Sequence, residues 1–267
     1  KKFAADVDLE ALATRTPGYS GADLANGLNE AAIMAVRRNH TEITMDDLDE
    51  AVDRVMSGPA KKSRKYSPEE KRMVAIHEAG HAVIGLFVTD ANIVQKVTII
   101  PRGLAGGYNL MLPKEERMLS TRNELLAHIT SFLGGRVAEE ICLGEMSTGA
   151  SNDIERATTI AKNMIVKYGM SDNLGSRTFG GSNDEVFIGR DFGHTKAYSE
   201  AVAAQIDSEI KSIIDSCYAK CEQILTEQND KLHKVAELLL EKEKIEEDEF
   251  ESIFTAKEEV EEITESE

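Results

Sequence analysis

One five-residue motif, His77-Glu78-Ala79-Gly80-His81, restricts the fold of this chain more than any other feature. Histidines at positions i and i+4 lie on the same face only if the segment is an α-helix, with Glu78 beside them. This is the spacing of a zinc-binding helix, in which both imidazoles bind the metal and the glutamate acts as a general base. Zinc acidifies a bound water from a pKa of about 16 towards roughly 7, and the glutamate then takes its proton. The motif therefore predicts hydrolysis of an amide bond.

The residues around the motif favour zinc over its plain alternative, a structural histidine pair. Apolar residues occupy positions 74–76 and 82–84, so the helix is expected to be buried. Three polar groups in such a helix are costly to bury without partners. A metal removes most of that cost. We therefore expect zinc on His77 and His81.

Composition limits the kinds of partner and compartment. The net charge of −17 argues against binding to nucleic acid, whose phosphates would be repelled. Residues 241–267 hold twelve Glu and one Asp against three Lys, which predicts a solvated helix running into an acidic C-terminal tail. Cys142, Cys217 and Cys221 form no disulfide framework, which indicates a reducing compartment, and Cys217 and Cys221 are interpreted as ordinary helix residues. No stretch reaches the roughly 20 apolar residues of a membrane span, so the chain is expected to be soluble.

The spacing of apolar residues, together with capping residues, glycines and prolines, predicts a mainly α fold in two parts. Three short helices come first, and Gly58-Pro59 with the basic run 61–65 reads as a linker. The motif helix starts after Ser67-Pro68, a cap followed by proline at the first helical position. A glycine pair, Gly134-Gly135, is expected to interrupt one later helix, and 169–193 to form a long loop. The predicted helices cover residues 8–14, 20–38, 44–56, 69–87, 121–141, 153–168, 195–227 and 230–241.

A small β hairpin is predicted beside the motif helix, from strands 97–100 and 108–112 separated by glycines and a proline. An edge strand at this place could hold an extended peptide through main-chain hydrogen bonds. A hairpin that only covers the core fits the sequence equally well.

Zinc needs a third protein ligand, and three acidic residues compete for that role. Glu139 and Glu140 follow the glycine pair on a helix, where a downstream glutamate can complete a zinc site. Asp153 follows a small-residue loop, and a cap at Ser151 or Asn152 would place it in the first turn of a helix. The helix dipole there stabilises a carboxylate by roughly 0.3–1 kcal/mol. Spacing alone does not decide among the three.

Several motifs in one order resemble the FtsH family of ATP-dependent zinc metalloproteases. The resemblance covers nearly the whole chain and includes a segment similar to the helical lid of an AAA+ ATPase module, Thr16 to Leu24 with Asn29 to Ala32. The other matching segments are residues 77–81, 99–103, 134–136 with 138–140, and 147–153.

The resemblance implies a domain order and a zinc site. It implies an incomplete AAA+ lid at 1–57, a linker at 58–68 and a mostly helical zinc metallopeptidase domain with an acidic tail at 69–267. The family pattern puts the third zinc ligand on Asp153 and the base on Glu78. Glu139 or Glu140 would then orient a ligand histidine or be structural.

The resemblance also implies a larger assembly. In the family, a membrane-anchored homo-hexamer unfolds membrane or cytosolic proteins with its ATPase ring and feeds them to the protease ring, on the cytoplasmic face of the membrane. This chain has no Gly-x-x-x-x-Gly-Lys-[Ser/Thr] loop, so ATP and Mg²⁺ are expected only in a longer parent. Departures from the family are Gly27, where an aliphatic residue is usual, and a shorter turn after Gly103. The alternative function is an oligomerisation and regulatory module with a structural zinc.

Overall fold

The computed structural model describes residues 1–61, 66–88, 92–103, 105–114, 119–179 and 198–255. Most of the basic run, the end of the predicted long loop and the end of the acidic tail lie outside these residues. The chain divides into two compact units. One comprises Lys1–Glu78, Asn92–Lys114 and Ala236–Glu267, and the other comprises Ala79–Ala91 and Glu115–Val235. Helices dominate both units, which confirms the predicted fold class.

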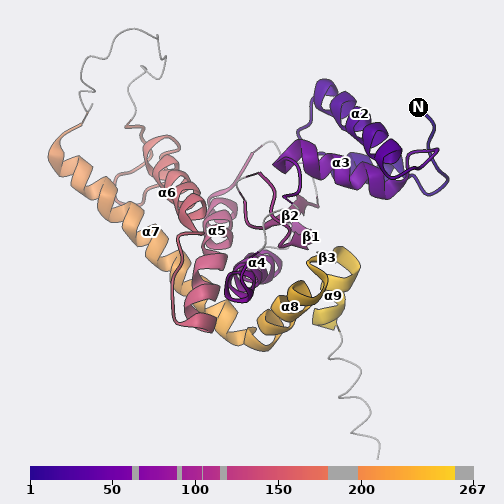
Figure 1. Cartoon of the computed structure of the whole chain (residues 1–267). Helices are drawn as coiled ribbons and strands as arrows, with labels where there is room; N and C mark the ends of the chain where they lie inside the picture. Colours follow the sequence, from indigo (N-terminus) through magenta and orange to yellow (C-terminus); the bar gives the residue numbers. More distant parts are fainter. Residues whose placement is uncertain (62–65, 89–91, 104, 115–118, 180–197, 256–267) are drawn as a thin grey trace, which may run out of the picture. The chain divides into compact units, whose positions relative to one another are not determined.

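The first unit begins with three helices, α1 (Leu9–Thr14), α2 (Gly21–Arg37) and α3 (Met45–Ser57), at almost the predicted bounds (Figure 1). Ser20 and Thr44 cap α2 and α3 in full capping boxes, which is why the sequence located both starts. Helices α2 and α3 pack together. Gly27 lies buried in α2, and a methyl group added there would meet no atom within 4 Å. The core of these helices is Leu12, Ala31, Ala35, Ile43, Leu48, Ala51 and Val52.

A fully buried carboxylate, Asp47, ties the start of α3 to the end of α2. Its oxygens accept hydrogen bonds from Arg38 Nη1 at 2.7 Å, His40 Nδ1 at 2.8 Å and Thr44 Oγ1 at 3.0 Å. Burial by itself raises the pKa of Asp47, but these bonds outweigh it and lower the pKa to about 2. Asp47 is therefore ionised in the folded helices at every pH above that value.

We expect Asp47→Asn to destabilise the three-helix segment by about 2 kcal/mol at pH 7, because lowering a pKa by one on folding stabilises the ionised form by about 1.4 kcal/mol. The folded pKa lies below the unfolded one, so this stability is present above about pH 4 and is lost as the pH falls towards 2. Urea unfolding followed by circular dichroism at pH 7 and pH 3 measures both values. Asp46→Asn is the control, since exposed Asp46 pairs with the same Arg38. Equal losses for the two variants would contradict the role given to burial.

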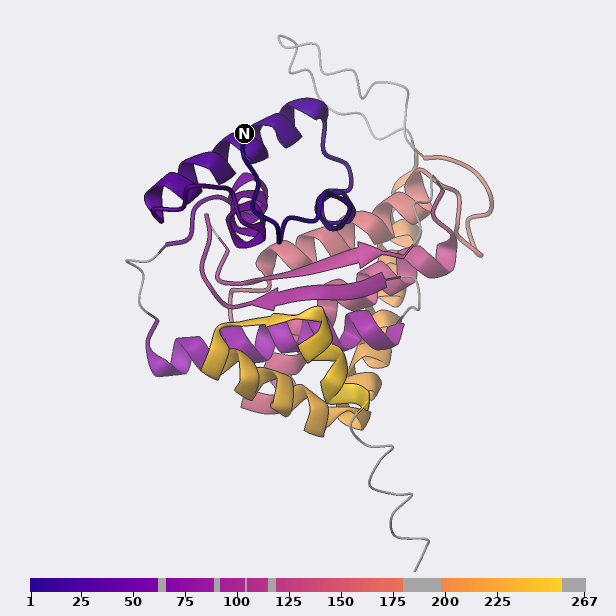
Figure 2. The same ribbon diagram turned by 90° about the vertical axis from the view of Figure 1, so that its right-hand side faces the viewer.

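The first unit also contains a three-stranded antiparallel sheet, in the order β2 (Tyr108–Pro113), β1 (Asn92–Thr98) and β3 (Lys244–Glu246) (Figure 2). Strands β1 and β2 form the predicted hairpin, with Val97 opposite Asn109 and a register shift between Val94 and Lys96. The predicted bounds of the first strand, 97–100, were wrong, because the chain leaves the sheet at Ile99.

The third strand, β3 (Lys244–Glu246), was missed, because three residues among glutamates and lysines give no alternating apolar pattern. It pairs with β1 from Lys96 to Thr98 and leads into α9 (Glu247–Thr255). Between α8 (Asn229–Lys242) and α9 the acidic segment thus forms part of the sheet, and it is not one solvated helix. Ile245 is fully buried, and so the charged run contributes to the core.

Buried ion pairs join α3 to the sheet within the first unit. Lys96 Nζ lies 3.2 Å from both oxygens of Asp53, and these side chains are 4% and 8% exposed. Arg102 binds Glu50 through two bonds of 3.0 and 2.6 Å. Removing one member of such a pair leaves an unpaired buried charge, which costs about 3–5 kcal/mol. The helices at the start of the chain are therefore held to the sheet by charge as well as by packing.

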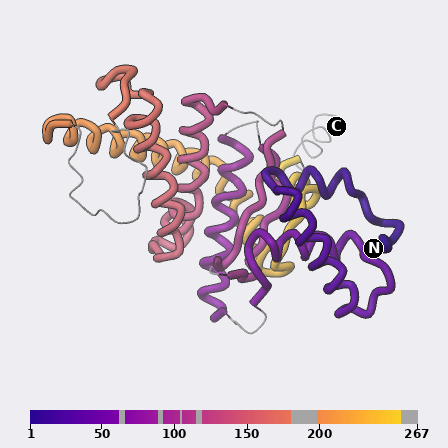
Figure 3. Tube along the Cα trace, turned by 90° about the horizontal axis from the view of Figure 1, so that it is seen from above, coloured from indigo at the N-terminus to yellow at the C-terminus, as the bar shows by residue number. Residues whose placement is uncertain are grey.

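The second unit is a helical bundle. Helices α5 (Arg122–Leu143), α6 (Ser151–Val166) and α7 (Glu200–Glu227) pack on one another (Figures 1 and 3). Helix α8 (Asn229–Lys242) follows, and the boundary between the units falls within it. In the described part of the chain, no helix is both long and apolar enough to span a membrane. The bundle core contains Ile129, Leu133, Ala157, Ala161, Met164 and Cys217.

Candidate metal centre

Helix α4 (Pro68–Val88) carries the two histidines and the glutamate of the motif. It starts where predicted: the Glu70 amide donates to Ser67 Oγ, and the Glu70 carboxylate accepts from the Ser67 amide. The motif is buried with the helix, since His77 is 9% exposed and Glu78 is 6% exposed. The flanking apolar residues that the sequence singled out are mostly buried with it, including Ala75, Ile76, Ala82, Val83 and Ile84.

The orientation of His81 is set by a backbone carbonyl. Its Nδ1 lies 2.8 Å from the oxygen of Ser131 on α5. A carbonyl only accepts, so Nδ1 carries a proton, and in the neutral ring Nε2 then keeps its lone pair. This is the usual arrangement for a histidine that binds a metal through Nε2. The sequence did not point to Ser131, since a backbone partner leaves no mark on the residue type.

Close packing of α4 on α5 makes this bond possible. A Cβ on Gly80 would overlap the carbonyl oxygen of Gly134, and it would lie 2.5 Å from the Cβ of Ala138. Both glycines are therefore needed for the two helices to approach. The prediction that Gly134-Gly135 interrupts the helix was wrong: α5 is continuous, and Gly134 packs closely against Gly80.

Asp153 lies in the first turn of α6, as predicted, but the predicted cap was wrong. The N-cap is Ala150, and its side chain makes no capping bond. The loop before the helix is held instead by Glu139, which accepts hydrogen bonds from the Ser147 amide at 2.8 Å and from Ser147 Oγ at 2.9 Å. Glu139 is 1% exposed. It therefore anchors the loop that leads to Asp153.

The three acidic candidates occupy different places. Asp153 Oδ2 lies 3.5 Å from His81 Nε2. Glu139 contacts Ser147, and Glu140 lies on the exposed side of α5, where it accepts a hydrogen bond from Tyr218. The expectation that a glutamate orients a ligand histidine does not hold for His81, whose Nδ1 binds Ser131.

His77, His81 and Asp153 form a cluster that could hold a metal ion. Each offers one ligand atom, and these atoms all lie within 4.8 Å of one another. Two ligands each about 2.1 Å from a tetrahedral zinc ion are about 3.4 Å apart, so the 3.5 Å between His81 and Asp153 fits. Two imidazoles and a carboxylate are also a donor set that zinc accepts. Among the described residues this is the one such cluster, and three ligands leave a coordination position for water or substrate.

Glu78 has a partner on strand β2 that the sequence reasoning missed. Asn109 Nδ2 lies 2.6 Å from Glu78 Oε2 and 3.1 Å from the Glu78 carbonyl oxygen. The available signal was a single polar amide inside the apolar strand 108–112. That signal shows a buried polar contact, but it does not name the partner.

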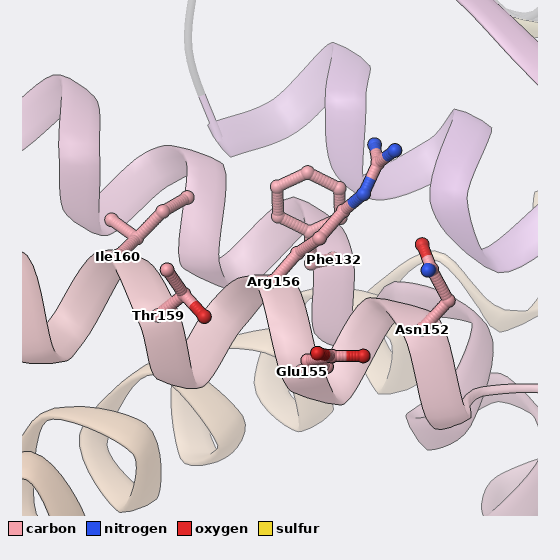
Figure 4. A pocket seen from close by; sticks show the side chains of 6 residues that line it. All are labelled: Phe132, Asn152, Glu155, Arg156, Thr159 and Ile160. Atoms are coloured by element: carbon pink, nitrogen blue, oxygen red, sulfur yellow. The ribbon is translucent and has the colours of Figure 1, made fainter. Parts of the chain in front are cut away.

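A hollow of about 410 Å³ lies between α5 and α6, next to the turn that holds Asp153 (Figure 4). The guanidinium of Arg156 lies 5.7 Å from the centre of the Phe132 ring. None of the predicted site residues lines this hollow. Its lining residues are Phe132, Asn152, Glu155, Arg156, Thr159 and Ile160.

Two protein-family models match parts of this chain. Residues 64–253 match the model of peptidase family M41, and residues 6–50 match an AAA+ lid domain. The chain is 53% identical over 254 residues to the ATP-dependent zinc metalloprotease FtsH 1 of Thermoanaerobacter sp. (strain X514), covering 95% of this chain and 42% of the relative. It is 55% identical over 235 residues to FtsH of Bacillus subtilis (strain 168), covering 88% and 37%.

The chain spans about two fifths of the length of the relatives it matches. The matches confirm the predicted FtsH resemblance and the peptidase family, and the matched relatives are named as zinc metalloproteases. The domain bounds 1–57, 58–68 and 69–267 stay a prediction. The M41 model covers most of the sequence, and the chain therefore belongs to peptidase family M41.

Proposed function

We propose that this chain is the zinc endopeptidase part of a longer ATP-dependent protease and that it hydrolyses peptide bonds of unfolded polypeptides. The observation that carries the proposal is the cluster of His77, His81 and Asp153, with Glu78 between the two histidines on α4. His77, His81 and Asp153 would hold the zinc ion. Bound zinc supplies a Lewis acid that polarises the scissile carbonyl and acidifies the attacking water.

The residues of the chain transfer the protons and hold the ligand and base side chains in position. The Glu78 carboxylate takes the proton of the attacking water and delivers it to the leaving amine. Because His81 donates Nδ1–H to Ser131, its Nε2 is fixed as the ligand atom. Burial of His77 and Glu78 keeps bulk water away from the base. Together these features favour amide hydrolysis over a purely structural zinc, which four protein ligands would enclose.

Substrate is proposed to bind as an extended strand along β2. This strand is at one edge of the sheet, since β1 pairs with it on one side only in the order β2-β1-β3. Main-chain hydrogen bonds to an edge hold a peptide with little regard to its side chains. Leu110 and Leu112 are buried, so the hairpin also covers the core.

For the longer protein we propose the assembly that the family resemblance implies. This is a membrane-anchored homo-hexamer whose ATPase ring, using ATP and Mg²⁺, delivers membrane or cytosolic proteins to the peptidase at the cytoplasmic face. The match of residues 6–50 to an AAA+ lid supports the link to an ATPase module.

The test is removal and return of the metal. We expect the purified chain with one zinc per molecule to cleave casein, an unfolded substrate. A chelator should abolish cleavage, and added zinc should restore it, because the three ligands cannot activate water without the ion. Metal analysis and a gel-based cleavage assay on the same samples measure both quantities. Stoichiometric zinc without any cleavage of casein would favour the alternative, a regulatory module with a structural zinc.

A further inference from the structure

Asn109 holds the carboxylate of Glu78 from the neighbouring sheet. Its Nδ2 group makes two hydrogen bonds to this one residue, to Oε2 at 2.6 Å and to the backbone carbonyl at 3.1 Å. The amide has two N–H groups, and both therefore serve the same glutamate. The residues are 31 positions apart in sequence.

Gly107 has no side chain, and this leaves space for the Glu78 carboxylate. A Cβ built on Gly107 would lie 2.7 Å from Glu78 Oε1 and 2.8 Å from its Cγ. It would also lie 2.5 Å from the Thr98 carbonyl oxygen. Any larger residue would have to push Glu78 or the strand aside. The chain thus donates to one carboxylate oxygen from Asn109 and leaves space beside the other at Gly107.

A glutamate side chain has three rotatable bonds, and ordering it costs conformational entropy. Hydrogen bonds to an ionised partner are roughly twice as strong as neutral ones, so the Asn109 amide limits the rotation of Glu78. It does not itself accept or release a proton under ordinary conditions. Its effect on a reaction would therefore come through the position of the Glu78 carboxylate.

We propose that Asn109 is a positioning residue that aims the general base. This inference rests on the proposed function, because it assigns Asn109 a role in that reaction. Asn109 also lies on β2, the strand proposed to carry the peptide, opposite Val97 of β1. One strand would then place both the base and the substrate.

The activity test compares Asn109→Ala, Asn109→Asp and Gly107→Ala using a fluorogenic peptide. We expect kcat to fall about 10- to 100-fold in Asn109→Ala, the range found when a partner of a site residue is removed, with KM changed less than about twofold. Asn109→Asp keeps the shape of the side chain but sets a carboxylate against Glu78, so its loss should be larger. Gly107→Ala should also lower kcat, because its methyl group displaces the carboxylate.

Two variants are matched controls with the same chemical changes elsewhere. Asn123→Ala removes an exposed amide in the first turn of α5, and Gly27→Ala adds a methyl where no atom lies within 4 Å. Both should keep the wild-type kcat, and all variants should keep one zinc per chain. If packing were the role of Asn109, the isosteric Asn109→Asp would be milder than Asn109→Ala. That ranking, or an unchanged kcat, would overturn the proposal.

A second readout needs neither zinc nor activity. The NMR signals of the Asn109 side-chain amide, identified by their loss in Asn109→Asp, should move in a Glu78→Gln variant of the metal-free protein. Unmoved signals would overturn the contact. If the wild-type chain proved inactive while the signals moved, the proposed function would fail and the placement of Glu78 by Asn109 would stand.

Discussion

Glu78→Gln is expected to abolish proteolysis while leaving zinc in place. The substitution keeps the size of the side chain, and its amide oxygen can still accept from Asn109 Nδ2. It removes the group that takes the proton of the attacking water, which typically contributes 10²–10⁴-fold to a rate. We therefore expect casein cleavage to fall by about that factor and zinc per chain to remain as in the wild type. Cleavage of casein and metal analysis on one preparation measure both.

Glu69→Gln is the matched control, because it makes the same change in the exposed first turn of the same helix. It should cleave casein at the wild-type rate. If Glu78→Gln retained activity, another residue would be the base. If it lost zinc, the loss of activity would say nothing about proton transfer, and the cluster of three ligands would be incomplete.

Asp153→Ala is expected to cause the largest loss of zinc. It removes one of the three residues whose ligand atoms lie within 4.8 Å of one another. Loss of a ligand should weaken binding by more than the roughly 10- to 100-fold that follows when an outer partner is lost. The loss of zinc affinity in Glu139→Ala should lie within that smaller range, because Glu139 anchors the loop before Asp153 through Ser147. Competition with a chelator of known zinc affinity measures all of these changes.

Glu140→Ala provides the control for this series. Its carboxylate lies on the exposed side of α5 and accepts from Tyr218, so zinc affinity should change little. Zinc loss that is larger in Glu140→Ala than in Asp153→Ala would transfer the ligand role to Glu140. Zinc loss that is equal in Asp153→Ala and Glu139→Ala would mean that the loop, and not the carboxylate of Asp153, controls binding.

The sequence predicted features that depend on neighbours along the chain. The starts of α2, α3 and α5 follow from capping residues three positions before an acidic partner, and such bonds form within one helical turn. The His77 and His81 pair is also local, since the pitch of a helix alone brings positions i and i+4 together. For the same reason Glu78 was found with them.

Features that depend on contacts between distant segments required the tertiary structure. Spacing left Glu139, Glu140 and Asp153 open as third ligands, because three carboxylates on two helices look alike until the helices are packed. Strand β3 was hidden in a charged run, since a strand of three residues is stabilised by its pairing with β1 and not by its own pattern.

The site shows most clearly which features depend on local sequence and which depend on tertiary contacts. The sequence determined which side chains could carry the chemistry, His77, Glu78 and His81, because a single helix presents them. Only the tertiary structure brought Asp153 to His81, Ser131 to its other ring nitrogen and Asn109 to Glu78. The physical reason is that helix geometry is fixed by local hydrogen bonds, whereas the approach of α5, α6 and β2 depends on close packing, such as the contact of Gly80 with Gly134.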